Sequence, residues 1–144
     1  MASDYERSDQ LGVMQIEASN KLDQFILGVT LAICAYLAQT NPYAPLGLNQ
    51  ETMLLFSLLI FASSAAFGFW RIEAKIAVMF ANAQALDANN SEVIEAHRSM
   101  GLKFIRKSVL HYHCRNILLV AGLATYVGTK VWASYQSNGW IPLH

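Results

Sequence analysis

The chain has 144 residues, and its ten basic residues balance its ten acidic ones. Only 14% of the residues are charged and 54% are hydrophobic, whereas a soluble domain carries roughly 25% charged residues. This composition argues against a soluble enzyme, a disordered chain and a disulfide scaffold. The zero net charge provides no field that would attract nucleic acid.

Charged residues are missing from three blocks of the sequence, and the first two predict membrane-spanning helices most clearly. A helix needs about 20 mostly apolar residues to cross the hydrocarbon layer. The first block predicts a retained span over 22–40, with Asp23 at the membrane surface, rather than a cleaved signal peptide. The second predicts a span over 52–70, which is apolar on every face and too long for a small soluble core to surround. Asn49 is the expected N-cap of this helix, with Glu51 in its first turn.

The third block is shorter, and it reaches the length of a span only when the residues that follow it are included. If Lys130 extends its ammonium group to the interface, the span covers 117–135. A soluble or re-entrant helix is the alternative for this block. With three spans, the sequence predicts an all-α integral membrane protein.

The distribution of Lys and Arg predicts the orientation. The connection 41–51 and the tail 136–144 have none, whereas 71–116 has seven and the N-terminal segment 1–21 has two. Because positive charge stays on the cytoplasmic side, we expect the N-terminus and 71–116 to be cytoplasmic and the other two segments to be external. A bacterial inner membrane is the simplest location.

The segment 71–116 is expected to form a cytoplasmic amphipathic helical hairpin. Apolar residues at helical spacing extend the second helix to about Ala88. Asn89 is then a candidate N-cap, with Glu92 at the third position of a helix that runs toward Leu110. The N-terminal segment 1–21 is expected to fray or to form a short helix of its own.

Basic residues on the second helix of this hairpin are candidates for contact with lipid headgroups. An interfacial helix would place them at lipid phosphates, and a hairpin facing solvent is an equally good interpretation. The basic stretch is short and poor in aromatic residues, so we expect no nucleic-acid partner. The candidates are Arg98, Lys103, Arg106 and Lys107.

Small residues at helical spacing mark one face of each span as a packing face or a contact between copies. Such residues let helix backbones approach closely where lipid gives no hydrophobic driving force. These faces are Gly28, Ala32 and Ala35 in the first span, Ser57, Ser64 and Gly68 in the second, and Ala121, Ala124 and Gly128 in the third.

Residues with reactive side chains are few, and no catalytic motif is recognisable. The weak candidates for a metal or haem site are His97, His111, His113 and Cys114. Ligands at this spacing on a helix converge poorly on one ion, so we expect no resident metal and no cofactor. Cys34 and Cys114 lie too far apart in the expected arrangement to form a disulfide.

Three functions remain open from the sequence. The first is a non-enzymatic accessory or assembly subunit that forms a homo-oligomer or joins a larger membrane complex. The second is a pore-forming effector of the defence or lysis type, with hydroxyl side chains lining a pore between several copies. The third is a haem or quinone anchor of a respiratory complex. The hydroxyl candidates are Ser57, Ser63, Ser64, Thr125 and Thr129.

Overall fold

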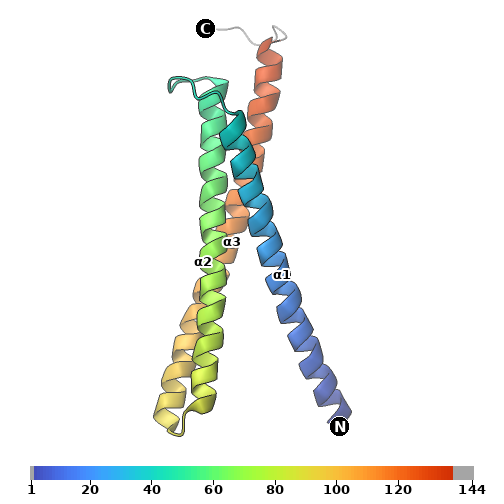
Figure 1. Cartoon of the computed structure of the whole chain (residues 1–144), viewed down its shortest axis with the longest axis vertical. Coiled ribbons are helices and arrows are strands. Elements are labelled where there is room, and N and C mark those ends of the chain that lie inside the picture. The colour runs from blue at the N-terminus through green and yellow to red at the C-terminus, as the bar shows by residue number, and fades with distance from the viewer. Residues whose placement is uncertain (1, 138–144) are drawn as a thin grey trace.

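A computed structural model describes residues 2–137 as three long α-helices without a strand among them (Figure 1). Helix α1 covers Ala2–Thr40, α2 covers Gln50–Asp87 and α3 covers Ser91–Ser137. Each helix contains a stretch long and apolar enough to cross a membrane, which confirms the predicted all-α class and its three candidate spans. The last seven residues of the expected tail 136–144 lie outside the described residues.

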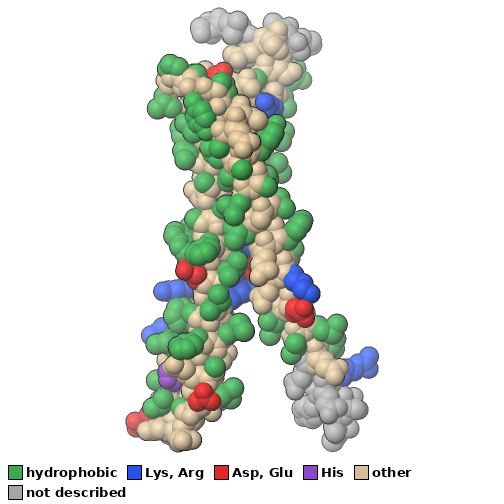
Figure 2. Space-filling model, in the orientation of Figure 1, with side chains coloured by type: hydrophobic (Ala, Val, Ile, Leu, Met, Phe, Trp, Pro, Cys, Tyr) green, Lys and Arg blue, Asp and Glu red, His purple; other side chains and the backbone are tan. Residues whose placement is uncertain are grey.

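The two ends of the molecule are named here by their connections. The loop end holds the connection 41–49 between α1 and α2, and the hairpin end holds the turn 88–90 between α2 and α3. In Figure 1 the loop end is at the top, and the hairpin end and the N-terminus are at the bottom. The charged side chains gather mainly in the lower half of Figure 2.

Helices α1 and α3 are longer than the sequence analysis predicted. Residues 2–21 of the N-terminal segment do not form a short helix of their own, because α1 continues from Ala2 through the predicted span. The helix expected to run toward Leu110 continues without a break to Ser137. Neither helix contains a proline, so a change in hydropathy along the chain does not interrupt the backbone hydrogen bonds.

At the loop end, side chains fix the start of α2. Asn49 is the N-cap, as predicted, and its Oδ1 accepts a hydrogen bond of 2.8 Å from the Thr52 amide. The Thr52 hydroxyl in turn accepts from the amide of Gly47 at 3.1 Å. Asn41 donates its Nδ2 to the carbonyl of Glu51 at 3.2 Å, which ties the end of α1 to the first turn of α2.

At the hairpin end, the predicted cap was wrong by one residue. Helix α3 begins at Ser91, and Asn90 precedes it instead of Asn89. The side-chain oxygen of Asn90 accepts from the Glu92 amide at 3.0 Å, and its carbonyl accepts from the Ile94 amide at 3.0 Å. The turn is therefore one residue longer than a cap at Asn89 would give.

The buried residues of α1 and α3 recur every seven positions. This spacing is typical of helices that pack at a shallow left-handed crossing angle. A Cβ atom added to Gly122 would lie 3.1 Å from ring carbons of Phe61 on α2, so a glycine permits the close approach of α2 and α3 at this point. The series are Asp23, Thr30 and Leu37 in α1, and Gly101, Ser108, Arg115, Gly122 and Thr129 in α3.

Helix α1 packs less closely than the other two helices. Helices α2 and α3 pack along most of their length, whereas α1 contacts mainly α2. In Figure 1 the N-terminal part of α1 leans away from the α2–α3 pair toward the bottom of the view. The molecule is consequently closed at the loop end and open at the hairpin end.

Candidate functional site

The point where the three helices begin to separate is occupied by a buried carboxylate. Asp23 lies on the inward face of α1, one heptad before Thr30, and its side chain is only 3% exposed. A buried carboxylate requires charged or hydrogen-bonding partners. Asp23 has three cationic partners, all from other helices.

The partners approach Asp23 from two helices. Arg71 and Lys75 lie one turn apart on α2, so their side chains emerge on the same face. Arg71 Nε donates to Asp23 Oδ2 at 2.9 Å, and Lys75 Nζ donates to the same oxygen. Arg115 of α3 donates its Nη1 to Asp23 Oδ1 at 2.8 Å. These four residues form what we call the Asp23 cluster.

Neutral groups hold the cations of the Asp23 cluster in place. Arg71 Nη1 donates to the carbonyl of Ser108 on α3 at 3.1 Å. The ring of Tyr112 lies beneath both guanidinium groups, with its centroid 4.6 Å from Cζ of Arg71 and 5.3 Å from Cζ of Arg115. Such contacts of cations with an aromatic face are favourable and restrict the arginine rotamers.

Arg115 is the most deeply buried of the three cations. Its side chain is 2% exposed, and its carbonyl accepts a hydrogen bond of 2.9 Å from the Ser64 hydroxyl. Arg115 Nε donates to Asn116 at 3.1 Å, but Nη2 is buried and has no hydrogen-bond partner among the described residues. Buried hydrogen-bond donors without a partner are rare in folded proteins.

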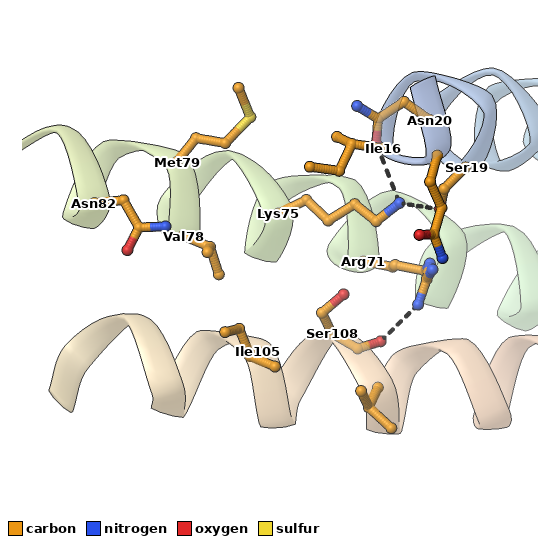
Figure 3. A pocket seen from close by; sticks show the side chains of 12 residues that line it. Ile16, Ser19, Asn20, Arg71, Lys75, Val78, Met79, Asn82, Ile105 and Ser108 are labelled. Atoms are coloured by element: carbon orange, nitrogen blue, oxygen red, sulfur yellow. Dashed lines mark hydrogen bonds between the residues drawn. The ribbon is translucent and has the colours of Figure 1, made fainter. Parts of the chain in front are cut away.

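A groove opens beside the Asp23 cluster, between α1 and the α2–α3 pair, with a volume of about 540 Å³. Figure 3 shows Lys75 reaching across it to Ser19 and Asn20 of α1, at 3.0 and 3.1 Å. Arg71 and Lys75 line this groove together with apolar side chains of all three helices. Those apolar residues are Ile16, Val78, Met79, Ile105 and Val109.

The small-residue faces have different positions in the three helices. In α2, Ser57, Ser64 and Gly68 are buried between the helices, and a Cβ on Gly68 would lie 3.4 Å from atoms of Arg115 and Leu27. The faces of α1 and α3 are exposed on the outside of the single chain. Their members are Gly28, Ala32 and Ala35 in α1, and Ala121, Ala124 and Gly128 in α3.

The small residues did not determine which face of α1 turns inward. Asp23, Thr30 and Leu37 form the inward face, and it lies opposite Gly28 and Ala32 on the helix. The ion pairs of Asp23 fix this rotation of α1. Packing between copies by the outer faces of α1 and α3 stays a prediction.

The expected headgroup residues lie together on the hairpin-end half of α3. All four are exposed, and Lys107 lies over the ring of Phe104, with Nζ 5.8 Å from its centroid. Contact with lipid stays a prediction for this set, which comprises Arg98, Lys103, Arg106 and Lys107.

The hydroxyl residues that were expected to line a pore between copies are mostly turned into the chain. Ser57, Ser64 and Thr129 are buried. Ser63 and Thr125 reach the surface at least in part, but their hydroxyls donate to the carbonyls one turn earlier, at 2.8 Å each.

The histidines and Cys114 do not converge. No group of three His, Cys, Asp or Glu side chains in the part of the chain that the structure describes could hold a metal ion. His111 lies against the rings of Phe67 and Trp70, at centroid distances of 5.9 and 6.0 Å. His113 packs against the ring of Tyr112, and Cys114 is a free thiol. His97 lies two heptads before His111 on α3, toward the hairpin end.

Sequence reasoning missed the Asp23 cluster because Asp23 was placed at the membrane surface, whereas its three cationic partners were counted only as charges of the cytoplasmic segment 71–116. Asp23 precedes the first apolar block, Arg71 follows the second and Arg115 precedes the third. These three positions lie at the same end of neighbouring antiparallel spans. That placement indicates that the carboxylate and the two guanidinium groups can come into contact. The inward rotation of each helix, by contrast, could not be read from the sequence.

Neither the family models, nor the curated proteins, nor the solved structures contain a match to this chain.

Proposed function

We propose that this protein is a non-enzymatic integral membrane subunit that assembles with itself or within a larger membrane complex. Three helices that could cross a membrane support the membrane location. In the proposed orientation the hairpin end and the N-terminus are cytoplasmic and the loop end is external, in a bacterial inner membrane.

The observation that carries the assembly role is the outward position of the small-residue faces of α1 and α3. Packing within the chain uses Ser57, Ser64 and Gly68 of α2 but leaves Ala32 and Ala124 on the surface. In a bilayer, small residues favour contact between helices, because their backbones approach closely. These two faces therefore suit a second copy or the helix of another subunit.

A second observation agrees with an assembly role. Large apolar side chains remain exposed on the hairpin-end halves of the helices, which the proposed orientation places beyond the bilayer. Water makes such exposure unfavourable by roughly 25 cal/mol per Å² of apolar surface. Examples on three helices are Leu11, Phe80, Leu86 and Leu102.

Site-specific photo-crosslinking in native membranes tests the assembly role. A small diazirine-bearing amino acid replaces Ala32 or Ala124, and the matched control carries it at Val29, which is also exposed on α1. The proposal predicts a protein adduct of defined mass from the first two positions and mainly lipid adducts from the third. Lipid adducts alone at all three positions would contradict it.

The pore and the haem or quinone anchor gain no specific support from the described residues. Most hydroxyl candidates for a pore face the interior of the single chain. His111 packs against the rings of Phe67 and Trp70. The assembly subunit therefore stands as the single proposal.

A further inference from the structure

Positive charge exceeds negative charge where the groove meets the Asp23 cluster. Arg71, Lys75 and Arg115 share one carboxylate, that of Asp23. Three positive charges and one negative charge leave an excess of two positive charges among the described side chains of the cluster. Because the surrounding helices exclude much of the water, such an excess is unfavourable unless a further anion approaches.

Two of the cations are accessible to an anion in the groove. Arg71 and Lys75 line it, and their side chains are 12% and 25% exposed, whereas Arg115 is enclosed. Asp23 separates the accessible pair from Arg115. An anion that neutralises Arg71 and Lys75 would leave Asp23 free to balance Arg115.

Neutral donors lie beside the accessible cations. The Ser19 hydroxyl is 3.0 Å from Lys75 Nζ, and Asn20 and Ser108 line the same groove. A guanidinium group, an ammonium group and a hydroxyl group together are the donor set that suits the several acceptor oxygens of a phosphate. The groove volume of about 540 Å³ leaves room for a phosphate with an organic substituent.

We propose that this groove binds a phosphate group, which contacts Arg71 and Ser19, takes the place of Asn20 as a hydrogen-bond partner of Lys75 and supplies the missing negative charge. The apolar walls formed by Ile16, Val78 and Ile105 would contact the organic part of a phosphate ester. The group can come from an anionic phospholipid or from a soluble phosphate, which share this chemistry. Only the lipid source rests on the proposed membrane orientation, which places the cluster at the level of the inner headgroups.

A carboxylate introduced into the groove tests the proposal most sharply. In Ser19→Asp the new charge lies next to Lys75 Nζ and takes the place of the phosphate, while all three cations stay. Ser19→Asn is the matched control, because its side chain has nearly the same shape and no charge. The full-length protein is purified and placed in nanodiscs of phosphatidylcholine, with or without phosphatidylglycerol.

Thermal unfolding and the lipid retained per chain are measured for each variant. The proposal predicts that phosphatidylglycerol, or inorganic phosphate added to phosphatidylcholine nanodiscs, raises the Tm of the native chain. The Tm of Ser19→Asn should rise as well, because the asparagine amide can donate to the phosphate in place of the serine hydroxyl. Ser19→Asp should have a higher Tm without either ligand and bind them about tenfold more weakly, as expected for one lost charge-assisted contact. A response to the lipid alone identifies a headgroup, and a response to inorganic phosphate identifies a soluble source.

A second pair of variants separates this site from general attraction to anionic lipid. Lys75→Gln removes a cation of the groove, and Lys130→Gln removes an exposed cation of α3 that does not line the groove. Binding should fall in the first variant and stay near the native value in the second. Equal binding by all variants, or no response of the native Tm to either ligand, would overturn the proposal. Because each readout is taken per chain, it does not depend on whether the chain assembles.

Discussion

Arg115 Nη1 lies 2.8 Å from Asp23 Oδ1, although the two residues are separated by 92 positions in the chain. This ion pair joins α1 to α3, which otherwise contact each other little. Both side chains are almost completely buried, at 2% and 3% exposure. One carboxylate of α1 therefore binds cations of both α2 and α3.

Replacement of this carboxylate should loosen α1. In Asp23→Asn, Arg71, Lys75 and Arg115 lose their shared counter-charge while the shape of the side chain is kept. Removing one partner of a buried ion pair costs about 3–5 kcal/mol, so the free energy of unfolding in detergent should fall by a comparable amount. Titration with a denaturing detergent, followed by circular dichroism, measures it.

Glu17→Gln is the matched control on the same helix. Glu17 forms an exposed pair with Lys21 at 2.8 Å, one turn apart. Exposed pairs contribute little because water screens them, so this variant should unfold at nearly the native detergent concentration. Equal stability of Asp23→Asn and Glu17→Gln would show that the Asp23 cluster does not hold the fold together.

Gly122 should tolerate substitution less well than other glycines of the spans. In Gly122→Leu the new side chain meets the ring of Phe61, because even a Cβ would lie 3.1 Å from it. Overpacking of this kind costs typically 1–3 kcal/mol, so the free energy of unfolding should fall by about 2 kcal/mol. Gly128→Leu on the same helix has open space around it and should unfold like the native chain.

A second-site change distinguishes overpacking at Gly122 from a general effect of leucine on the helix. Phe61→Ala combined with Gly122→Leu removes the ring that the new side chain meets. The double variant should be more stable than the sum of the two single changes predicts, since the residues are in contact. Strict additivity of the two changes would count against the contact.

The helices of this fold could be predicted from the sequence because their determinants are local. The charge-free blocks predicted the apolar stretches of all three helices, and Asn49 was identified as a cap from its place before a helical pattern. The extent of α1 and α3 was underestimated. Hydropathy changes near Lys21 and Leu110, but helical hydrogen bonds require only a chain without breakers, and they continue there.

The inward face of α1 could not be predicted, because it depends on how the helices are rotated relative to one another. Asp23 was interpreted as a residue of the membrane surface, and Thr30 and Leu37 are ordinary residues of an apolar span, whereas Gly28 and Ala32 stand out by their small size. Helix α1 turns the first set inward because three cations on α2 and α3 require the carboxylate. The small-residue rule identified the inward face only in α2, where Arg71 and Lys75 continue the same face at helical spacing.

The outer small-residue faces yield a prediction about assembly. Gly28→Leu and Gly128→Leu should leave the stability of the single chain nearly unchanged, because nothing lies within 4 Å of either position. If these faces contact a second copy or another subunit, both variants should lose the assembly in mild detergent. Size-exclusion chromatography with light scattering measures the loss, and assembly at the native level in both variants would contradict it.

Cysteine labelling tests the proposed orientation. Leu46 at the loop end and Leu86 at the hairpin end are both highly exposed, so a cysteine at either position is accessible to a maleimide from its own side of the membrane. In a chain with Cys34→Ala and Cys114→Ala, Leu46→Cys should react with a membrane-impermeant maleimide in intact cells. Leu86→Cys should react only after the membrane is opened. The reverse pattern would place the hairpin end outside.

The mass of the complex extracted from native membranes tests the assembly role most directly. A single chain has a mass of 16.0 kDa. The account predicts a complex whose protein mass is a multiple of this value, or one that contains another protein in fixed proportion. A particle that holds one 16.0 kDa chain and only lipid, at the native expression level and in the mildest extraction, would contradict it.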